Sequence, residues 1–444
     1  MKQWIDSKMD EQLEELKNLI RIPSVSRGEA EDGMPLGRNV HDALHYALEL
    51  ANRLGFEKTQ SLDGYCGTVD YGEGDEMLMI MAHLDVVPAG TGWDSDPFEP
   101  VVKNGRLIGR GVLDDKGAAV SALYALAAVK EAGIPLKRRV RLFFGCDEEL
   151  GWACIDRYKE TEPMPTMAFT PDGDYPLVNS EMSICQMQYR KALSGSGVQI
   201  ACGIAPNVIP GEAAATLNVP AVVCKVPAGF TADFCGNTIS VKGYGGHASE
   251  PDLAKNAMLC LLDILSQQPL QEDDLLAASS LHALLAYDKH GEGFGLDIRD
   301  ASGHLTLSPD MLSWNADGIC LTLDSRYPFV CPYEHLTEKT DNAFAAIGFE
   351  RTTLKNTPGH YIEPDSELVK TLLSIYEENI GHKAKPLSIG GGTYARGFEN
   401  AVAFGLIKEG EHSECHMPNE SMALDDIRFN TLVMAQAIQK LAGK

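Results

Sequence analysis

Residues 77–85, MLMIMAHLD, and residues 109–117, GRGVLDDKG, decide how the rest of the chain is interpreted. The first six residues form an unbroken apolar run, as in a strand that is buried on both faces. His83 and Asp85 follow this run and, because side chains alternate along a strand, are expected to point to the same side. One can bind a metal ion while the other accepts the second N–H of the imidazole. Together with Asp114, these residues predict a metal hydrolase.

Strands and helices alternate through the first part of the chain. Apolar runs at 139–145 and 166–170 are typical of further strands, and GAAVSALYALAAVKEA has helical character and ends at Gly133. This alternation predicts an α/β fold with a doubly wound mixed sheet between helices. In proteins with such sheets, ligands bind just beyond the carboxyl ends of the strands. Charged clusters follow each of these predicted strands, so the site is expected there.

The pattern changes at about residue 183, where strand-like segments follow one another without long helices between them. Residues 183–356 are therefore predicted to form an inserted α+β domain, long enough for two ferredoxin-like units. Its first long helix is predicted at 253–267. The earlier pattern returns afterwards, so residues 1–182 and 357–444 are predicted to form one discontinuous domain that carries the metal site.

Length and composition limit the number of domains and the kinds of binding partner. The chain has 444 residues, which predicts two domains. Its 63 acidic and 38 basic residues give a net charge of −25. This balance disfavours nucleic acid and anionic membranes as partners, because both attract clustered Lys and Arg. No run of 18 apolar residues is present, and the charged amphipathic N-terminus is unlike a signal peptide. Eleven cysteines without a C-x-x-C pair favour a reducing, cytoplasmic compartment.

Candidate metal ligands follow the predicted strands in turns, and one more lies in HMPNE near the C-terminus. They are His83, Asp114, Glu149, Asp172 and His416. Imidazole and oxygen ligands without thiolates favour zinc, manganese or cobalt over a structural zinc site. A single catalytic ion that keeps an open position cannot take all of them. They suit two ions about 3.5–4 Å apart that share one bridging carboxylate.

Individual motifs also permit other interpretations. Glu148 and Glu149 could simply lie at a helix N-terminus, where the helix macrodipole favours acidic side chains. Their position at the end of a predicted strand instead favours one glutamate as a metal ligand and the other as a proton acceptor. Cys415 beside His416 could suggest a thiol nucleophile, although no orienting third group is evident. The glycines at 390–392 lack the Lys-Ser/Thr of a phosphate-binding loop.

Several motifs in combination resemble a known family. HLDVVP, GRGVLDDKG, DEELG, TPDG and HMPNE resemble the motifs of the aminoacylase/carboxypeptidase family of di-metal peptidases. The resemblance covers essentially the whole chain. Within the family, the long insert and the segments NVIP, GYGGHASEP and GGGTYAR are most similar to bacterial dipeptidases of the dipeptidase V and Sapep type.

The resemblance implies a role for each candidate ligand. His83 and Asp172 would bind one ion, Glu149 and His416 the other, and Asp114 would bridge them. His416 is preferred over His412 because it opens the HMPNE motif, and Asp114 over Asp115 because of the family pattern, which also implies a cis peptide between these two aspartates.

The remaining roles also come from the resemblance. Asp85 would orient His83, and Glu148 would be the general base. The insert would act as a lid, in which His247 stabilises the oxyanion while Asn207 and Arg326 hold the carboxylate of the substrate. Thr393, in GGGTYAR, is also expected to bind substrate.

The implied function is a metal-dependent dipeptidase that hydrolyses short peptides with a hydroxide bridging two divalent ions, zinc or manganese, with cobalt as a third candidate. An N-acyl amino-acid deacylase or desuccinylase of the same family is the alternative substrate class. A non-catalytic binding protein on this fold is disfavoured, because every ligand position and the base are filled. The long insert suggests that the chain supplies its own His247, so a monomer is expected.

Overall fold

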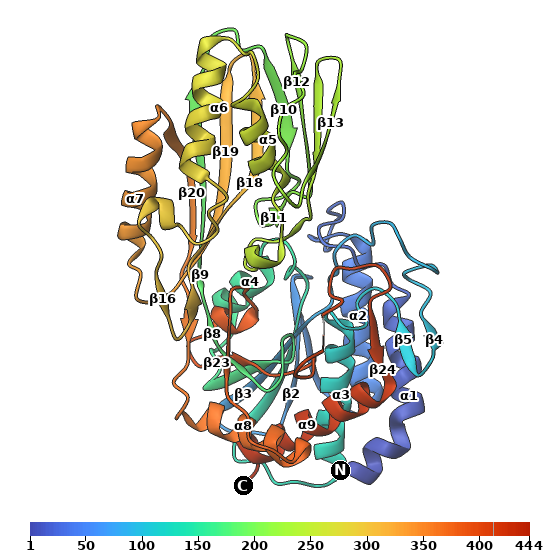
Figure 1. The fold of residues 1–444 in the computed structure, drawn as a ribbon. Coiled ribbons are helices and arrows are strands. Elements are labelled where there is room, and N and C mark those ends of the chain that lie inside the picture. The colour runs from blue at the N-terminus through green and yellow to red at the C-terminus, as the bar shows by residue number, and fades with distance from the viewer. Residues whose placement is uncertain (412) are drawn as a thin grey trace. The chain divides into compact units, whose positions relative to one another are not determined.

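The computed structural model describes residues 1–411 and 413–444, and the chain divides into two compact units (Figure 1). The first unit comprises Met1–Asn179, Tyr361–Leu387 and Gly392–Lys444. The second comprises Ser180–His360 and Ser388–Gly391. The first unit is therefore built from segments that are far apart in the sequence.

A nine-stranded mixed sheet lies at the centre of the first unit, counted over the described residues. Its order is β1-β2-β6-β3-β7-β23-β8-β21, and β22 pairs with β8. The inner strands β6, β3, β7 and β23 are parallel to one another, whereas β1, β2 and β8 are antiparallel to neighbours. The strands are β1 (Lys58–Leu62), β2 (Cys66–Tyr71), β3 (Met77–His83), β6 (Arg139–Gly145), β7 (Met167–Thr170), β8 (Val178–Glu181), β21 (His360–Tyr361), β22 (Leu387–Ile389) and β23 (Ala401–Ala403).

Helices cover both faces of this sheet, as the doubly wound prediction requires. Leu78 and Ile80 of β3 join a core with the helices of one face, while Met79 and Met81 join a second core with α4 and the 3₁₀ helix η3 on the other. The apolar run in β3 is thus continuous because both of its faces are buried. The helices are α1 (Lys2–Ile20), α2 (Arg38–Arg53), α3 (Lys116–Glu131), α4 (Ala153–Thr161), α8 (Glu367–Ile380), α9 (Leu424–Ala442) and η3 (Tyr394–Gly397).

The second unit contains an eight-stranded antiparallel sheet, in the order β13-β14-β12-β10-β18-β19-β9-β20. Side chains from alternate positions pack against α5, α6 and α7 in one core. Where the sequence predicts two ferredoxin-like units, the structure has one continuous eight-stranded sheet that packs against α5, α6 and α7. Its elements are β9 (Ser183–Ala192), β10 (Val198–Cys202), β12 (Glu212–Leu217), β13 (Thr231–Cys235), β14 (Thr238–Lys242), β18 (Thr306–Asn315), β19 (Gly318–Tyr327), β20 (Glu350–Thr357), α5 (Ala257–Leu265), α6 (Glu272–Leu285) and α7 (Tyr333–Ala346).

Smaller ladders complete the fold. In the first unit, a three-stranded antiparallel sheet joins residues near the C-terminus to the region of the second sequence motif. The short elements are β4 (Val101–Lys103), β5 (Arg106–Ile108), β24 (Ser421–Ala423), β11 (Val208–Ile209), β15 (Gly246–His247), β16 (Arg299–Asp300), β17 (Gly303–His304), η1 (Pro251–Leu253) and η2 (Glu292–Phe294). Within the described residues, no helix has the length and apolar character needed to cross a membrane.

Local chemistry explains where the helices differ from the sequence prediction. The helix predicted at 253–267 begins only at Ala257, because the Asn256 side chain accepts the Met258 N–H at 3.0 Å and caps the helix. The segment before it forms η1. Helix α7 was not predicted, since its buried stripe includes two threonines and so has weak apolar periodicity.

One buried carboxyl group makes the stability of the second unit depend on pH. Asp310 in β18 is buried, its Oδ1 accepts a hydrogen bond from Ser308 Oγ at 2.5 Å, and its Oδ2 has no partner among the described residues. Burial, helped by the charge of Asp324, outweighs that hydrogen bond and raises the pKa of Asp310 to about 8. Between its ordinary value of 3.8 and about 8, the folded chain keeps a proton that the unfolded chain loses. Stability therefore falls as the pH rises through this window.

The substitution Asp310→Asn mimics the protonated carboxyl group and removes this dependence. Relative to the parent, the variant should gain stability progressively between about pH 4 and pH 8, read from denaturant midpoints. The exposed Asp317→Asn substitution is the matched control and should follow the parent. A difference between parent and Asp310→Asn that stays constant over this range would contradict the argument.

Candidate metal centre

His83 is the last residue of β3, and its imidazole is held by the chain just beyond the strand. Its side chain is 1 % exposed, and Nδ1 lies 2.9 Å from the backbone carbonyl oxygen of Asp85. A carbonyl only accepts hydrogen bonds, so Nδ1 carries the proton and the Nε2 lone pair is left free. That Nε2 is buried without a hydrogen-bond partner among the described residues. It lies 2.9 Å from Oδ1 of Asp114 and 3.7 Å from Oδ2 of Asp172.

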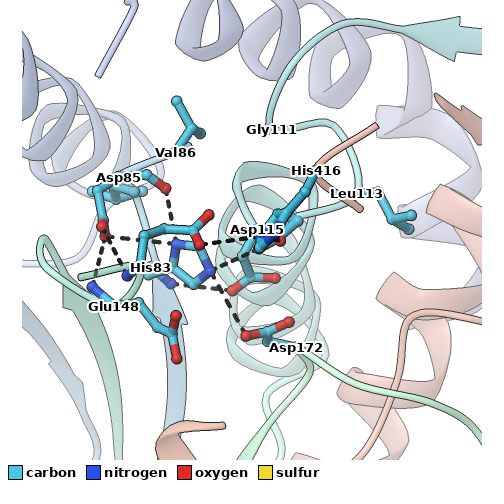
Figure 2. Close-up of polar contacts among 12 residues, drawn as sticks. His83, Asp85, Val86, Gly111, Leu113, Asp115, Glu148, Asp172 and His416 are labelled. Atoms are coloured by element: carbon cyan, nitrogen blue, oxygen red, sulfur yellow. Dashed lines mark hydrogen bonds and ion pairs between the residues drawn. The ribbon is translucent and has the colours of Figure 1, made fainter. Parts of the chain in front are cut away.

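The carboxylate of Asp114 lies between two imidazoles. Its Oδ1 faces His83, and its Oδ2 is 3.0 Å from Nε2 of His416. The same His416 nitrogen is 3.1 Å from Oε2 of Glu149. Figure 2 shows His83, Asp172 and His416 converging on this region from separate elements. Each imidazole thus has a second carboxylate beside it, Asp172 for His83 and Glu149 for His416, and both share Asp114.

These atoms fit the donor set of a metal site. Ligand atoms of His83, Asp114 and Glu149 all lie within 4.8 Å of one another. Besides Nε2 of His83, Oε1 of Glu149 is buried without a hydrogen-bond partner among the described residues. Orphaned acceptors of this kind are costly when buried and are satisfied by a cation. Imidazole and carboxylate donors suit zinc or manganese.

The carboxyl groups cannot all be ionised without a counter-charge. Burial would raise the pKa of Asp114, but the neighbouring imidazoles of His416 and His83 outweigh it and hold that pKa well below its ordinary value. Burial and the charge of Asp114 raise the pKa of Asp172 to about 7. Burial is also the main cause of the raised pKa of Glu149. A divalent cation would reverse these upward shifts, because it favours the charged form of each ligand.

Glu148 lies next to the candidate ligand Glu149 but takes part in no hydrogen bond through its side chain within the described residues. Burial, together with the charges of Asp172 and Glu149, raises its pKa well above the ordinary value, although the charge of His83 opposes this. A carboxylate with a raised pKa and no fixed partner is suited to accept a proton.

The carboxylate of Asp85 has a different contact from the one expected. One of its oxygens accepts a hydrogen bond from the backbone N–H of Glu148 at 3.1 Å (Figure 2). The other accepts the backbone N–H of Glu149 at 3.2 Å and the hydroxyl of Ser26 at 2.7 Å. The distance to Nδ1 of His83 is 3.6 Å, so the backbone carbonyl rather than the carboxylate accepts the imidazole proton. The alternation argument fails because β3 ends at His83. Asp85 therefore orients the turn that carries the two glutamates.

The turn that carries Asp114 is held by Glu420, a residue that the sequence analysis did not single out. Oε1 of Glu420 accepts backbone N–H groups of Gly111, Leu113 and Asp114, at 3.1, 2.8 and 3.1 Å. Its Oε2 binds the buried guanidinium of Arg110 at 2.6 Å. Arg110 also donates to the backbone carbonyl of His416 at 3.3 Å. Glu420 closes the HMPNE motif, so the motif supplies both a candidate ligand and the support of another.

Three further features lie close to Asp114 in the chain. The peptide bond between Asp114 and Asp115 is cis, as the resemblance implies. The carboxylate of Asp115 accepts the backbone N–H of His83 at 3.1 Å and therefore faces the strand. A Cβ at Gly117, near the start of α3, would lie 2.0 Å from the carbonyl oxygen of Val112, so only glycine fits at this position.

His412, the alternative to His416, lies outside the described residues.

The predicted substrate-binding residues are divided between the units. Thr393 belongs to the first unit, where its side chain caps η3 by accepting the Ala395 N–H. Asn207, His247 and Arg326 belong to the second unit. The backbone carbonyl of Asn207 accepts a hydrogen bond from the residue after His247. Their roles toward substrate stay predictions.

Arg326 is nearly buried and is fixed by neighbours in the second unit. Its guanidinium donates to both carboxylate oxygens of Asp324, at 2.7 and 3.2 Å, and to the carbonyl of Gly390 at 2.7 Å. Since a guanidinium has five N–H donors, these bonds leave others for a further acceptor.

Imidazoles and carboxylates that meet at the carboxyl ends of parallel strands define a metal-dependent hydrolase. Residues 79–440 match Peptidase family M20/M25/M40. The chain is 34% identical over 462 residues to the Bacillus subtilis protein YtjP, provisionally named as a dipeptidase, and the match covers 98% of each chain. The chain belongs to peptidase family M20/M25/M40 and is a peptide-bond hydrolase.

Solved structures share the fold. The yeast protein Dug1p from Saccharomyces cerevisiae, described as a di-peptidase, has a TM-score of 0.61 at 15% identity, covering 99% of this chain and 97% of that one. The Bacillus subtilis protein YXEP, described as a dinuclear metal-binding peptidase, has a TM-score of 0.56 at 10% identity, covering 97% of this chain and 98% of that one. Both matches extend over the catalytic and the inserted parts of the chain.

Replacing Glu420 with Gln tests the support of the Asp114 turn. The amide keeps the shape but weakens the acceptor that holds three N–H groups and Arg110, so metal affinity should fall about 10–100-fold. Competition with a chelator would measure it, and the exposed Glu99→Gln substitution is the control. Unchanged affinity in a folded Glu420→Gln chain would contradict the role.

Proposed function

We propose that this chain is a dipeptidase that works with two divalent metal ions. The observation that carries the proposal is the Asp114 carboxylate, shared between two imidazoles that each adjoin another carboxylate. A single ion needs only one imidazole with its neighbouring carboxylates. Two ions with a bridging carboxylate need two imidazole–carboxylate pairs on either side of the shared carboxylate, as around Asp114.

The ligand assignment follows from these pairs. His83 and Asp172 would hold one ion, Glu149 and His416 the other, and Asp114 would bridge them. Zinc or manganese suits these donors, with cobalt as a third candidate. When bound, such ions polarise a carbonyl oxygen and lower the pKa of water. The buried carboxylate ligands repel one another, and a bound cation would relieve this repulsion, so their arrangement favours metal binding.

Glu148 is proposed as the general base. Its carboxylate would accept a proton from the attacking water and then pass it to the leaving amine of the scissile peptide. The raised pKa supports this, since a proton acceptor works best when its pKa approaches the working pH. Asp85 fixes the backbone from which Glu148 projects, so it serves as a positioning residue.

Substrate binding is proposed for residues of both units. Asn207 and the uncommitted donors of Arg326 would hold the C-terminal carboxylate of the peptide, and His247 would stabilise the oxyanion. Thr393 would also contact the substrate. A carboxylate held in this way limits the length of peptide that can reach the ions, which favours dipeptides.

The cellular setting is part of the same proposal. All eleven cysteines are free thiols, which supports a reducing, cytoplasmic compartment. A long second unit that carries its own His247 supports a monomer, which light scattering would test. The relatives that match nearly the whole chain carry dipeptidase names, and this supports the choice of substrate.

The Glu148→Gln substitution tests the base. Glutamine cannot accept the proton, so kcat for a dipeptide should fall by about 10²–10⁴-fold while metal content, measured by elemental analysis, stays unchanged. The exposed Glu160→Gln substitution should retain parent activity. Near-parent turnover by Glu148→Gln would remove Glu148 from this role.

A substrate panel separates the dipeptidase from the deacylase alternative. Unblocked dipeptides should be cleaved with a kcat/KM at least tenfold above that for N-acetyl or N-succinyl amino acids, with each of zinc, manganese and cobalt supplied in turn. Arg326→Lys should raise KM for dipeptides, because a lysine cannot replace the planar guanidinium. Preference for the N-acyl substrates would favour the deacylase.

A further inference from the structure

The second unit contains a cavity of about 330 Å³ that the proposed chemistry does not use. It lies where β11, the residues before α5, the end of α6 and β18 meet, and all of its lining residues belong to this unit. Cavities that bind small molecules measure about 300–1,000 Å³. The size is therefore sufficient for a small ligand.

Much of the lining is apolar. Ile209, Leu259 and Leu307 line the cavity but are only 2%, 6% and 3% exposed, so they back the lining rather than form its surface. The half-buried rings of Phe230 and Tyr287, with centroids 5.9 Å apart, and the half-buried Pro227 form the apolar wall. A ligand with an aryl or branched aliphatic body would be desolvated by such a wall.

Most polar side chains of the lining are already committed to partners inside the unit. They are Asn256, Tyr287, Asp288 and Ser308. The carboxylate of Asp288 accepts two backbone N–H groups, so it is stabilised without a bound cation. These groups shape the cavity but offer little to a ligand.

Two lysines differ from this pattern. Lys255 forms no ion pair or side-chain hydrogen bond with any residue that the structure describes, and its stem lies over Gly229, 3.5 Å from where a Cβ would stand. Lys289 has only a long contact, 3.6 Å from a carboxylate oxygen of the exposed Asp252. In a chain with a net charge of −25, two weakly paired ammonium groups beside an apolar cavity favour an anion.

We propose that this cavity binds a small monocarboxylate with an apolar aryl or branched aliphatic body. The body packs against the rings of Phe230 and Tyr287, and the carboxylate pairs with the ammonium of Lys255. Lys289 adds a second positive charge. A cationic ligand of the same shape is disfavoured by both lysines.

The probe is 3-(4-fluorophenyl)propanoate, followed by ¹⁹F NMR with the full-length, metal-loaded chain. Saturable binding is expected, and Lys255→Gln should weaken it at least tenfold. Leu259→Trp should abolish it by filling the cavity. Lys242→Gln, an exposed lysine substitution in the same unit, is the control and should bind as the parent does. The isosteric amine, 3-(4-fluorophenyl)propylamine, should not bind.

Binding that persists in both Lys255→Gln and Leu259→Trp places the carboxylate elsewhere, such as at the metal centre, and overturns the proposal. Equal binding of the amine also overturns it, as does the absence of saturation at millimolar probe. Circular dichroism checks that each variant is folded. The readout needs no turnover, so its result is independent of the proposed dipeptidase activity.

Discussion

The interaction on which the rest of the structure depends is the shared carboxylate of Asp114. Two imidazoles and three acidic side chains meet around it in a buried place, where like charges repel strongly. Such a cluster is costly unless positive charge fills it. The upward shift in the pKa of Asp172 to about 7 expresses this repulsion. A bound metal ion would relieve it, so the same feature supports the proposed metal binding and the stability of the site.

The geometry of this cluster is maintained mainly through the backbone. Asp85 and Glu420 are acidic and buried, and each uses its carboxylate to hold N–H groups of a turn that carries candidate ligands or the proposed base. A carboxylate that accepts two or three backbone N–H groups is stabilised in its charged form and fixes those groups at once. The acidic residues of the site thus divide into candidate metal ligands and residues that fix the turns.

The sequence predicted the parts of the fold that depend on local pattern. The apolar run before His83 identified a strand buried on both faces, and the change of pattern near residue 183 indicated an inserted domain, where the second unit comprises Ser180–His360 and Ser388–Gly391. The role of Glu420 could not be predicted, because it acts on backbone groups 306–309 residues away and leaves no periodic signal. The contacts of Asp85 were missed because alternation stops where the strand ends.

The residues of the site come from segments on both sides of the second unit in the sequence, so the site forms only once these segments have folded together. His83, Asp114, Glu149 and Asp172 come before the second unit, whereas His416 and Glu420 come after it. The late segments reach the site through the pairing of β23 with β7 and of β24 with β5. The cluster of ligands therefore exists only when both ends of the chain have joined the first unit. Metal ions that bind the assembled cluster, and not its separate parts, would therefore add their binding free energy to the stability of the whole unit.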